Sequence, residues 1–322
     1  MKYKNKKITA GLFAYGETGF AALRGLMSDF EVKWIILSLA QGSQDTISVE
    51  SLALKQKIPV YKINSANDLF KIINKNIPEI VIISSYDKVL PEKILSLTKF
   101  INIHHGDLPR WRGRANINWA IINGRKDIGL TFHEAIPNLD EGNIYKQISV
   151  PITNMDTVKS VYDKFNYLIE KNIAEVAKKV VGGFPGKPQI GRGTYCCTRL
   201  PEDGYIDWSK KSSQIYNLIR GLTKPYPGAF TYFEGKKMII WDAQIPANPK
   251  KFEGRIPGRI VQIQKGYGVE VLTGDSTIIV KNVQYEGKDI DVGNIIKSVK
   301  KTLGINFHEF YEKLNRYFKE NE

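Results

Sequence analysis

The sequence predicts an α/β fold with a parallel sheet in its first part and a smaller, β-rich domain in its second part. Over residues 8–183, apolar runs that are typical of strands alternate with helical patterns, which indicates a parallel sheet whose strands are joined by helices. Residues 182–193 are rich in Gly and Pro, and short strands separated by turn residues follow residue 229. Because 322 residues also agree with about two domains, we expect a first domain over residues 1–190 and a second over residues 191–322.

The elements of the first domain follow from the spacing of the apolar residues. Residues 8–14 predict a buried strand, which a turn at Tyr15 and Gly16 joins to a helix. The glycines of this turn do not form the GxGxxG fingerprint, so a turn is favoured over a phosphate cradle. Further strands are predicted over residues 32–39, 59–61, 80–84, 100–103, 130–135 and 144–152. Further helices are predicted over residues 52–57, 66–74, 91–97 and 158–180, the last of which ends at a Gly-Gly pair.

The second domain is predicted to combine one helix with a small β-barrel or sheet. The helix covers residues 207–219 and leads to a Pro-rich turn. Strands separated by Gly, Pro and Asp turns are predicted over residues 230–233, 237–243, 258–264, 268–273 and 276–283. A basic helix over residues 307–318 follows them.

The net charge of +14 has three interpretations. It can reflect lysines scattered over the surface, a basic groove for an anionic small molecule, or a nucleic-acid surface. The lysines are spread along the whole chain, and no run of five or six basic residues occurs. This pattern favours scattered lysines first and a groove for an anionic small molecule second, and nucleic acid is not the expected partner.

The composition predicts a cytoplasmic protein that does not enter the membrane. No apolar run approaches the roughly 20 residues of a membrane span, and the first residues lack the apolar region and cleavage site of a signal peptide. The only cysteines, Cys196 and Cys197, are adjacent. Adjacent cysteines do not suit an ordinary disulfide framework, which agrees with a reducing compartment.

Polar residues gather where the predicted strands end, at the edge where parallel sheets bind ligands. Asn102 and His104 are two residues apart on one strand, so their side chains point to the same side. His104 is the natural general acid or base, Asp140 can orient or charge its imidazole, and Asn102 offers an amide to a developing oxyanion. His105 is expected to face away from His104, and His133 to be a packed or solvent-facing polar residue. Because these histidines match no zinc spacing, no metal is predicted.

The motifs around these residues resemble those of the formyltransferases that use 10-formyltetrahydrofolate. An Asn-x-His triplet alone is more often a loop hydrogen-bonding pattern, but here it is joined by two further motifs. The matching segments are Asn102-x-His104, Leu108-Pro109-x-Trp111-Arg112-Gly113 and Asp140-x-Gly142, within a resemblance that covers most of residues 8–183. Residues 199–208, 219–220 and 225–230 resemble the branch that acts on nucleotide-linked amino sugars. One departure is Gly106, which stands where the family commonly has Ser.

The resemblance implies a Rossmann-like formyltransferase domain followed by an OB-like domain. It implies transfer of a formyl group from 10-formyltetrahydrofolate to the amine of a dTDP- or UDP-linked amino sugar, as in O-antigen or surface polysaccharide synthesis, by a homodimer without metal. Methionyl-tRNA formyltransferase is the alternative. Against it, that enzyme carries a basic insertion after the second strand, whereas residues 40–54 here contain no Lys or Arg. A non-catalytic RNA-binding protein is disfavoured by the intact Asn102, His104 and Asp140.

The resemblance also assigns roles to individual residues. Asn102, His104 and Asp140 are the implied catalytic residues, with His104 as general base and Asn102 at the oxyanion. The implied folate contacts are Ser85, Tyr86, Asp87, Lys88, Arg114, Ile136, Pro137, Asn138 and Leu139. The implied contacts with the sugar nucleotide are Tyr15, Gly16, Arg112 and Tyr226. A structural salt bridge for Arg112, and packing within the β-rich domain for Tyr226, are equally weighted alternatives.

Overall fold

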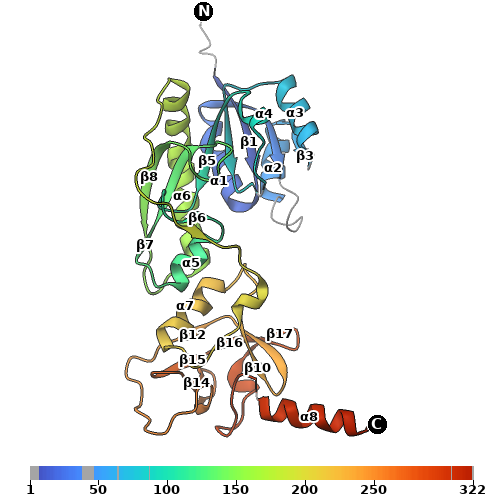
Figure 1. Ribbon diagram of the computed structural model, residues 1–322, viewed down its shortest axis with the longest axis vertical. Coiled ribbons are helices and arrows are strands. Elements are labelled where there is room, and N and C mark those ends of the chain that lie inside the picture. Colours follow the sequence, from blue (N-terminus) through green and yellow to red (C-terminus); the bar gives the residue numbers. More distant parts are fainter. Residues whose placement is uncertain (1–6, 38–46, 64, 87, 306, 321–322) are drawn as a thin grey trace, which may run out of the picture. The chain divides into compact units, whose positions relative to one another are not determined.

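The computed structural model describes residues 7–37, 47–63, 65–86, 88–305 and 307–320 (Figure 1). The chain divides into two compact units, which are described separately below. The first unit is Met1–Ile117, Lys126–Thr153 and Ser160–Thr198, and the second is Asn118–Arg125, Asn154–Lys159 and Arg199–Glu322. Two short segments from the first half of the chain thus cluster with the second unit. No helix among the described residues is long and apolar enough to cross a membrane.

The first unit is built on a seven-stranded sheet of order β3-β2-β1-β4-β5-β7-β8. In that order the strands are Val60–Lys62, Phe30–Leu37, Ile8–Ala14, Ile80–Ser84, Lys99–His104, Asp127–Glu134 and Ile144–Pro151. The first five strands are parallel, whereas β7 and β8 are antiparallel to their neighbours. The predicted α/β class is confirmed. The sheet differs from the predicted parallel one in that its last two strands form an antiparallel edge. Between β5 and β7 the chain forms α5 (Asn116–Ile122), of which residues 118–122 cluster with the second unit.

Helices cover both faces of this sheet. They are α1 (Gly16–Met27), α2 (Ile47–Lys55), α3 (Ala66–Lys75), α4 (Glu92–Leu95) and α6 (Val158–Val181). All five residues of β4 are buried, as expected for a strand with both faces covered. On one face α3 and α4 pack on the core formed by Phe13, Trp34 and Val81. On the other face α1 meets α6 closely at Gly25, where a Cβ atom would lie 2.6 Å from the carbonyl oxygen of Glu170.

The second unit contains two four-stranded antiparallel sheets, β10-β11-β16-β17 and β12-β15-β14-β13. In chain order, β10 to β17 are Ala229–Phe233, Lys236–Ile240, Ala243–Gln244, Ile260–Gln264, Gly268–Leu272, Thr277–Val280, Asn282–Tyr285 and Lys288–Asp291. The sheets share a core with α7 (Ser212–Leu222). Trp208 belongs to this core and donates its indole N–H to Thr231 Oγ1 at 2.9 Å. The predicted β-rich domain is therefore confirmed.

Two short strands, β6 (Arg112–Gly113) and β9 (Tyr195–Cys196), pair in the first unit.

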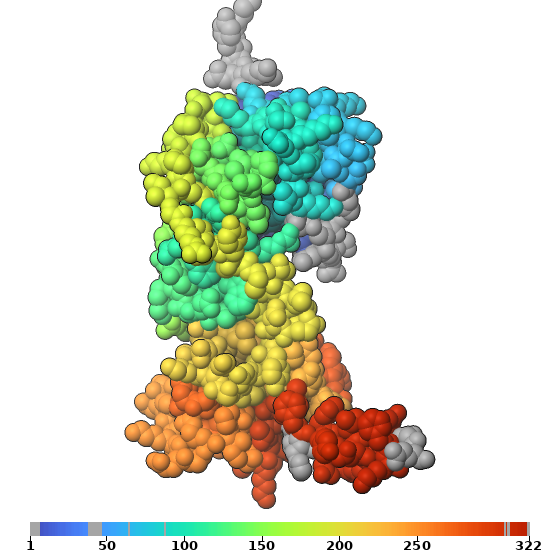
Figure 2. All heavy atoms as spheres, in the orientation of Figure 1, coloured from blue at the N-terminus to red at the C-terminus, as the bar shows by residue number. Residues whose placement is uncertain are grey.

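Two of the predicted strands in this unit are each divided into two. The predicted strand over residues 237–243 ends at Ile240 and resumes as β12, and the strand over residues 276–283 divides into β15 and β16. Both divisions occur where the N–H of Lys281 donates to the carbonyl of Asp242 at 3.0 Å, so the chain passes from one sheet to the other at the same place. The helix α8 (Phe307–Glu320) is drawn in red in Figure 2, and its aromatic side chains, such as Phe307 and Tyr317, are exposed.

Candidate active site

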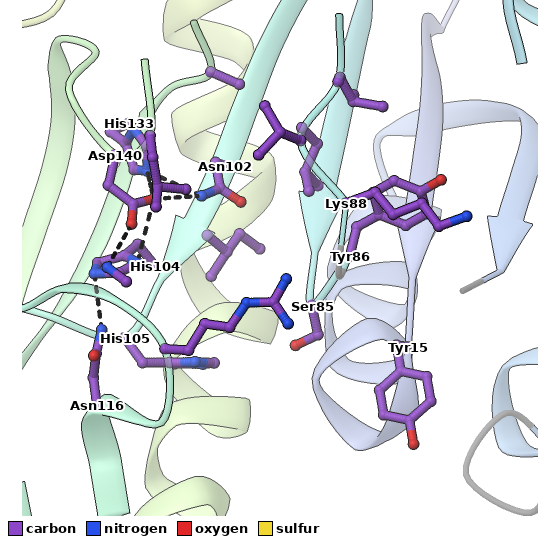
Figure 3. Close-up of a pocket in the computed structure, with 18 of the residues that line it drawn as sticks. Tyr15, Ser85, Tyr86, Lys88, Asn102, His104, His105, Asn116, His133 and Asp140 are labelled. Atoms are coloured by element: carbon purple, nitrogen blue, oxygen red, sulfur yellow. Dashed lines mark hydrogen bonds and ion pairs between the residues drawn. The ribbon is translucent and has the colours of Figure 1, made fainter. Parts of the chain in front are cut away.

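The carboxyl ends of β1, β4 and β5 border a cavity of about 430 Å³ in the first unit. This edge of a parallel sheet is where ligands of such folds bind. His104 is the last residue of β5, and Asn102 lies on the same face of that strand. Asp140 comes from the connection between β7 and β8, which returns to the same edge of the sheet. Figure 3 shows the three side chains pointing toward one another.

The three predicted catalytic residues are brought into contact. The Nδ1 atom of His104 lies 3.6 Å from Oδ1 of Asp140, and the Nδ2 atom of Asn102 lies 3.4 Å from the same oxygen. His104 and Asp140 are each only 6% exposed. A charge in so dry a place interacts strongly with its neighbours. The cluster can therefore hold a proton on an imidazole beside a carboxylate, which is the geometry of acid–base chemistry.

Asp140 is held as a carboxylate. Burial by itself raises the pKa of Asp140, but the neighbouring imidazoles of His133 and His104 and the N–H of Gly113 outweigh burial and lower the pKa to about 2. The Gly113 N–H donates to Oδ2 at 3.0 Å. The backbone of Asp140 is left-handed, with φ of 55°, and such strain is typical of functional sites.

The surroundings of His104 favour the neutral form of its imidazole. Burial lowers the pKa of His104, and the charge of Asp140 opposes this effect only in part. On its other side, Nε2 of His104 lies 2.7 Å from the carbonyl oxygen of Trp111 and 3.1 Å from Nδ2 of Asn116. A buried imidazole that stays neutral until it receives a proton suits a general base.

His133 is a member of the cluster that sequence analysis missed. It is 2% exposed, and its Nε2 lies 3.1 Å from Nδ2 of Asn102 and 3.6 Å from Oδ1 of Asp140. Of the two expectations for His133, the packed residue is confirmed and the solvent-facing one is wrong, and its place in the cluster was not predicted. The antiparallel register of β5 and β7 sets Asn102 directly opposite His133. A sequence signal for His133 would have required knowing that β7 is the antiparallel neighbour of β5.

Asn102 uses its amide nitrogen within the cluster. Nδ2 is within hydrogen-bonding distance of both His133 and Asp140, and Figure 3 shows the amide oxygen turned away from Asp140. The oxyanion role implied for Asn102 thus requires one of these two contacts to be exchanged for a substrate oxygen. The contact with Asp140, at 3.4 Å, is the longer and weaker of the two.

Seven of the other predicted site residues also line the cavity. They are Tyr15, Ser85, Tyr86, Lys88, Arg114, Ile136 and Leu139. Ser85 has a left-handed backbone, with φ of 64°, and the ring of Tyr86 packs edge-on against Phe13 with centroids 4.8 Å apart. His105 also lines the cavity, with its ring against Tyr162 and Phe165. The ring of His105 thus contacts α6, whereas the ring of His104 contacts Asp140.

The remaining predicted contacts lie elsewhere. Gly16, Pro137, Asn138 and Arg112 do not line this cavity, Asp87 lies outside the described residues, and Tyr226 belongs to the second unit. Arg112 is buried, and its guanidinium contacts Glu141 at 2.6 Å, Gln189 at 2.9 Å and Tyr195 at 3.1 Å. These contacts match the alternative of a structural salt bridge. Among the residues that the structure describes, no group of three His, Cys, Asp or Glu side chains is arranged to hold a metal.

Comparison with known proteins identifies the family. Residues 39–176 match the family model described as formyl transferase, and residues 200–299 match the model of the formyl transferase C-terminal domain. The chain is also 33% identical over 246 residues to the methionyl-tRNA formyltransferase of Caldanaerobacter subterraneus subsp. tengcongensis, covering 74% of this chain and 78% of that protein. The chain belongs to the formyl transferase family. The family predicted from the motifs is confirmed.

Other known proteins resemble the chain over most of its length. It is 34% identical over 341 residues to the bifunctional polymyxin resistance protein ArnA of Wigglesworthia glossinidia brevipalpis, covering 96% of this chain. The chain spans about half of that relative's length, 51%. The solved structure of WlaRD, a sugar 3N-formyl transferase, has a TM-score of 0.62 at 19% identity and covers 88% of this chain and 100% of that chain. At this identity the likeness shows that the two formyl transferases share a fold.

Proposed function

We propose that this formyl transferase moves the formyl group of 10-formyltetrahydrofolate to the amine of a dTDP- or UDP-linked amino sugar. The observation that carries the proposal is the buried contact of His104 and Asp140, with Asn102 beside them, at a cavity on the ligand-binding edge of the sheet. The sugar branch is supported by the motifs of residues 199–208. It also agrees with the fold shared with WlaRD, a sugar 3N-formyl transferase whose structure was solved in the presence of dTDP and 5-N-formyl-THF.

The size and the lining of the cavity support the proposed folate site. Its volume of about 430 Å³ falls within the roughly 300–1,000 Å³ of small-molecule sites. Apolar side chains such as Leu90, Leu95 and Ile136 line it beside the positively charged Lys88 and Arg114. The folate would be held by the implied contacts that line this cavity, and when bound it would supply an electrophilic formyl carbon.

The residues of the cluster divide the work of the reaction. His104 accepts the proton that the sugar amine loses as its nitrogen bonds to the formyl carbon, and returns it to the nitrogen that leaves. Asp140, ionised because its pKa is about 2, stabilises the imidazolium that forms in between. Asn102 donates its amide to the oxygen of the formyl group as negative charge develops there. A homodimer, a cytoplasmic location and a role in O-antigen or surface polysaccharide synthesis belong to the same proposal.

A product assay tests the proposal. The protein is mixed with 10-formyltetrahydrofolate and a panel of dTDP- and UDP-linked 3-amino and 4-amino sugars, and products are identified by mass spectrometry. We expect one sugar of the panel to gain a formyl group and His104→Ala to abolish most of the gain. Absence of a formylated sugar across the panel would refute the sugar branch.

Methionyl-tRNA formyltransferase is the second candidate function. It is favoured by the 33% identity to the Caldanaerobacter enzyme and by the net charge of +14. Formylation of initiator methionyl-tRNA, measured under the same conditions as the sugar panel, separates the two candidates. We expect no formylated tRNA, because residues 40–54 lack the basic side chains that the resemblance associates with tRNA.

A further inference from the structure

One nitrogen of the His104 imidazole is engaged by the backbone. Nε2 lies 2.7 Å from the carbonyl oxygen of Trp111. A carbonyl oxygen can only accept a hydrogen bond, so Nε2 must carry the hydrogen. In the neutral imidazole the accepting nitrogen is then Nδ1, the atom that faces Asp140 at 3.6 Å. The contact with Trp111 therefore decides which tautomer of His104 is present.

Asn116 holds the same carbonyl oxygen. Its Nδ2 lies 2.7 Å from the oxygen of Trp111, which identifies that atom as the amide nitrogen, because two oxygens at this distance would repel each other. Asn116 is 5% exposed and lines the cavity. The oxygen of Trp111 thus accepts from both Asn116 and His104, and since Nε2 carries a hydrogen, the Nδ2 atom of Asn116 at 3.1 Å does not donate to the ring. No position in the predicted motifs drew attention to Asn116.

Gly106 leaves the space in which this contact forms. A Cβ atom at Gly106 would lie 2.4 Å from the oxygen of Trp111 and 2.6 Å from Nε2 of His104. The residue cannot move away easily, because its carbonyl accepts a hydrogen bond from Thr131 Oγ1 at 2.6 Å. The position where the family commonly has Ser therefore requires Gly for this arrangement of the site.

The carbonyl of Trp111 is aimed by a constrained backbone. Trp111 has a left-handed conformation, with φ of 62°, which is uncommon for a bulky residue. Its N–H donates to Thr194 Oγ1 at 3.1 Å, and the N–H of Arg112 donates to the carbonyl of Thr194 at 2.8 Å. Such strain persists only where surrounding contacts enforce it.

We propose that Asn116 is a positioning residue that, with Gly106, holds the carbonyl of Trp111 on His104 and so keeps the proton on Nε2 and the accepting lone pair on Nδ1. The catalytic consequence rests on the proposed function. As an N–H bond of the attacking amine breaks, an N–H bond forms at Nδ1, and the positive charge appears beside Asp140. Without Asn116 and the carbonyl, Asp140 would favour the other neutral tautomer, whose Nδ1 already carries a hydrogen and cannot accept the proton.

The test reads the tautomer directly. The full chain is labelled with ¹⁵N-histidine, and the nitrogen shifts of His104 are measured by NMR against pH. The chain has 4 histidines, so single substitutions such as His105→Phe assign the signals. We expect Nε2 of wild-type His104 to show the shift of a protonated ring nitrogen and Nδ1 that of an unprotonated one. The opposite assignment in the wild type would overturn the proposal without any variant.

The variants connect the tautomer to the reaction. In Asn116→Ala and Gly106→Ser we expect a mixture of tautomers and a kcat lower by at least about tenfold, a part of the roughly 10²–10⁴-fold that a general base contributes, with KM nearly unchanged. Asn143→Ala is the matched control, because that amide also donates to a carbonyl, Pro185 at 3.1 Å, but outside the cavity lining. We expect this control to keep the wild-type tautomer and kcat.

Three groups besides Trp111 influence His104 and are included in the pH series: Asp140, His133 and Arg112. If Asn116→Ala and Gly106→Ser both keep the wild-type tautomer, the proposal fails. If the melting temperature shows that Asn116→Ala does not fold, the nitrogen shifts of Gly106→Ser and of the wild type still test the proposed tautomer. Because NMR requires no substrate, a failure to find a formylated sugar leaves this result intact, and the two proposals fail separately.

Discussion

His133 faces Asn102 across neighbouring antiparallel strands, with its Nε2 atom 3.1 Å from the amide nitrogen of Asn102. The other ring nitrogen, Nδ1, lies 2.7 Å from the carbonyl of Glu134. Since a carbonyl only accepts, Nδ1 carries the hydrogen and Nε2 accepts from Asn102. His133 thereby fixes the rotation of the Asn102 amide, on which the proposed contact with the formyl oxygen depends.

Replacement of His133 is expected to release that amide. In His133→Ala the amide of Asn102 loses one acceptor and can rotate, so we expect kcat to fall by about tenfold, less than the roughly 10²–10³-fold cost of losing an oxyanion donor entirely. His133→Gln, whose side-chain oxygen can accept in place of Nε2, is the matched variant and should retain more activity. Steady-state kinetics of both variants provide the measurement, and equal losses in both would contradict this role.

The pH dependence of the reaction follows from the unequal environments of His104 and Asp140. Asp140 stays ionised across the working range because its pKa is about 2, whereas burial places the pKa of His104 below its usual 6.5. The acid limb of kcat/KM therefore belongs to His104 and is expected to have a midpoint below 6.5. Asp140→Asn removes a negative charge that favours the imidazolium, so this midpoint should fall further, with a plateau lower by about 10²-fold.

A complete pH–rate profile of the wild type and Asp140→Asn checks both statements. Glu92→Gln, which removes an exposed carboxylate in the first turn of α4, is the control and should leave the midpoint in place. An upward movement of the midpoint in Asp140→Asn would mean that Asp140 does not face the titrating imidazole.

Much of the site was predictable because strand geometry and chain order determine where its residues lie. Side chains alternate between the two faces of a strand, so Asn102 and His104 lie on one side of β5. The parallel strands end at the same edge of the sheet, which brings Tyr15, Ser85 and Tyr86 there. His133 and Asn116 were not predictable in this way. His133 depends on the antiparallel pairing of β7 with β5, which the alternation of strands and helices along the sequence did not predict. Asn116 matters through a backbone carbonyl, and no residue type signals the direction of a carbonyl.

Arg112 shows the opposite case, in which a motif residue contacts the protein itself. Arg112 lies in the same short strand as Gly113, and its guanidinium contacts Glu141, Gln189 and Tyr195. We expect Arg112→Met to lower the free energy of unfolding by about 2 kcal/mol, less than the roughly 3–5 kcal/mol of a fully buried pair, because Glu141 is 35% exposed. Denaturant unfolding measures the loss. Arg110→Ala, an exposed arginine of the same loop, is the control and should be neutral.

The glycine of the Asp-x-Gly motif has a steric reason that a substitution can test. A Cβ atom at Gly142 would lie 2.1 Å from the carbonyl oxygen of Glu134, which is backbone and cannot turn aside. Gly142→Ala must therefore shift the segment that carries Asp140 and disturb its contact with His104. We expect a loss of about 1–3 kcal/mol in the free energy of unfolding, together with a lower kcat. Gly254→Ala, where a Cβ atom would meet nothing within 4 Å, is the control. If both substitutions change stability and kcat equally little, Gly142 does not hold Asp140 in place, and the strained backbone of Asp140 must be maintained by its side-chain contacts alone.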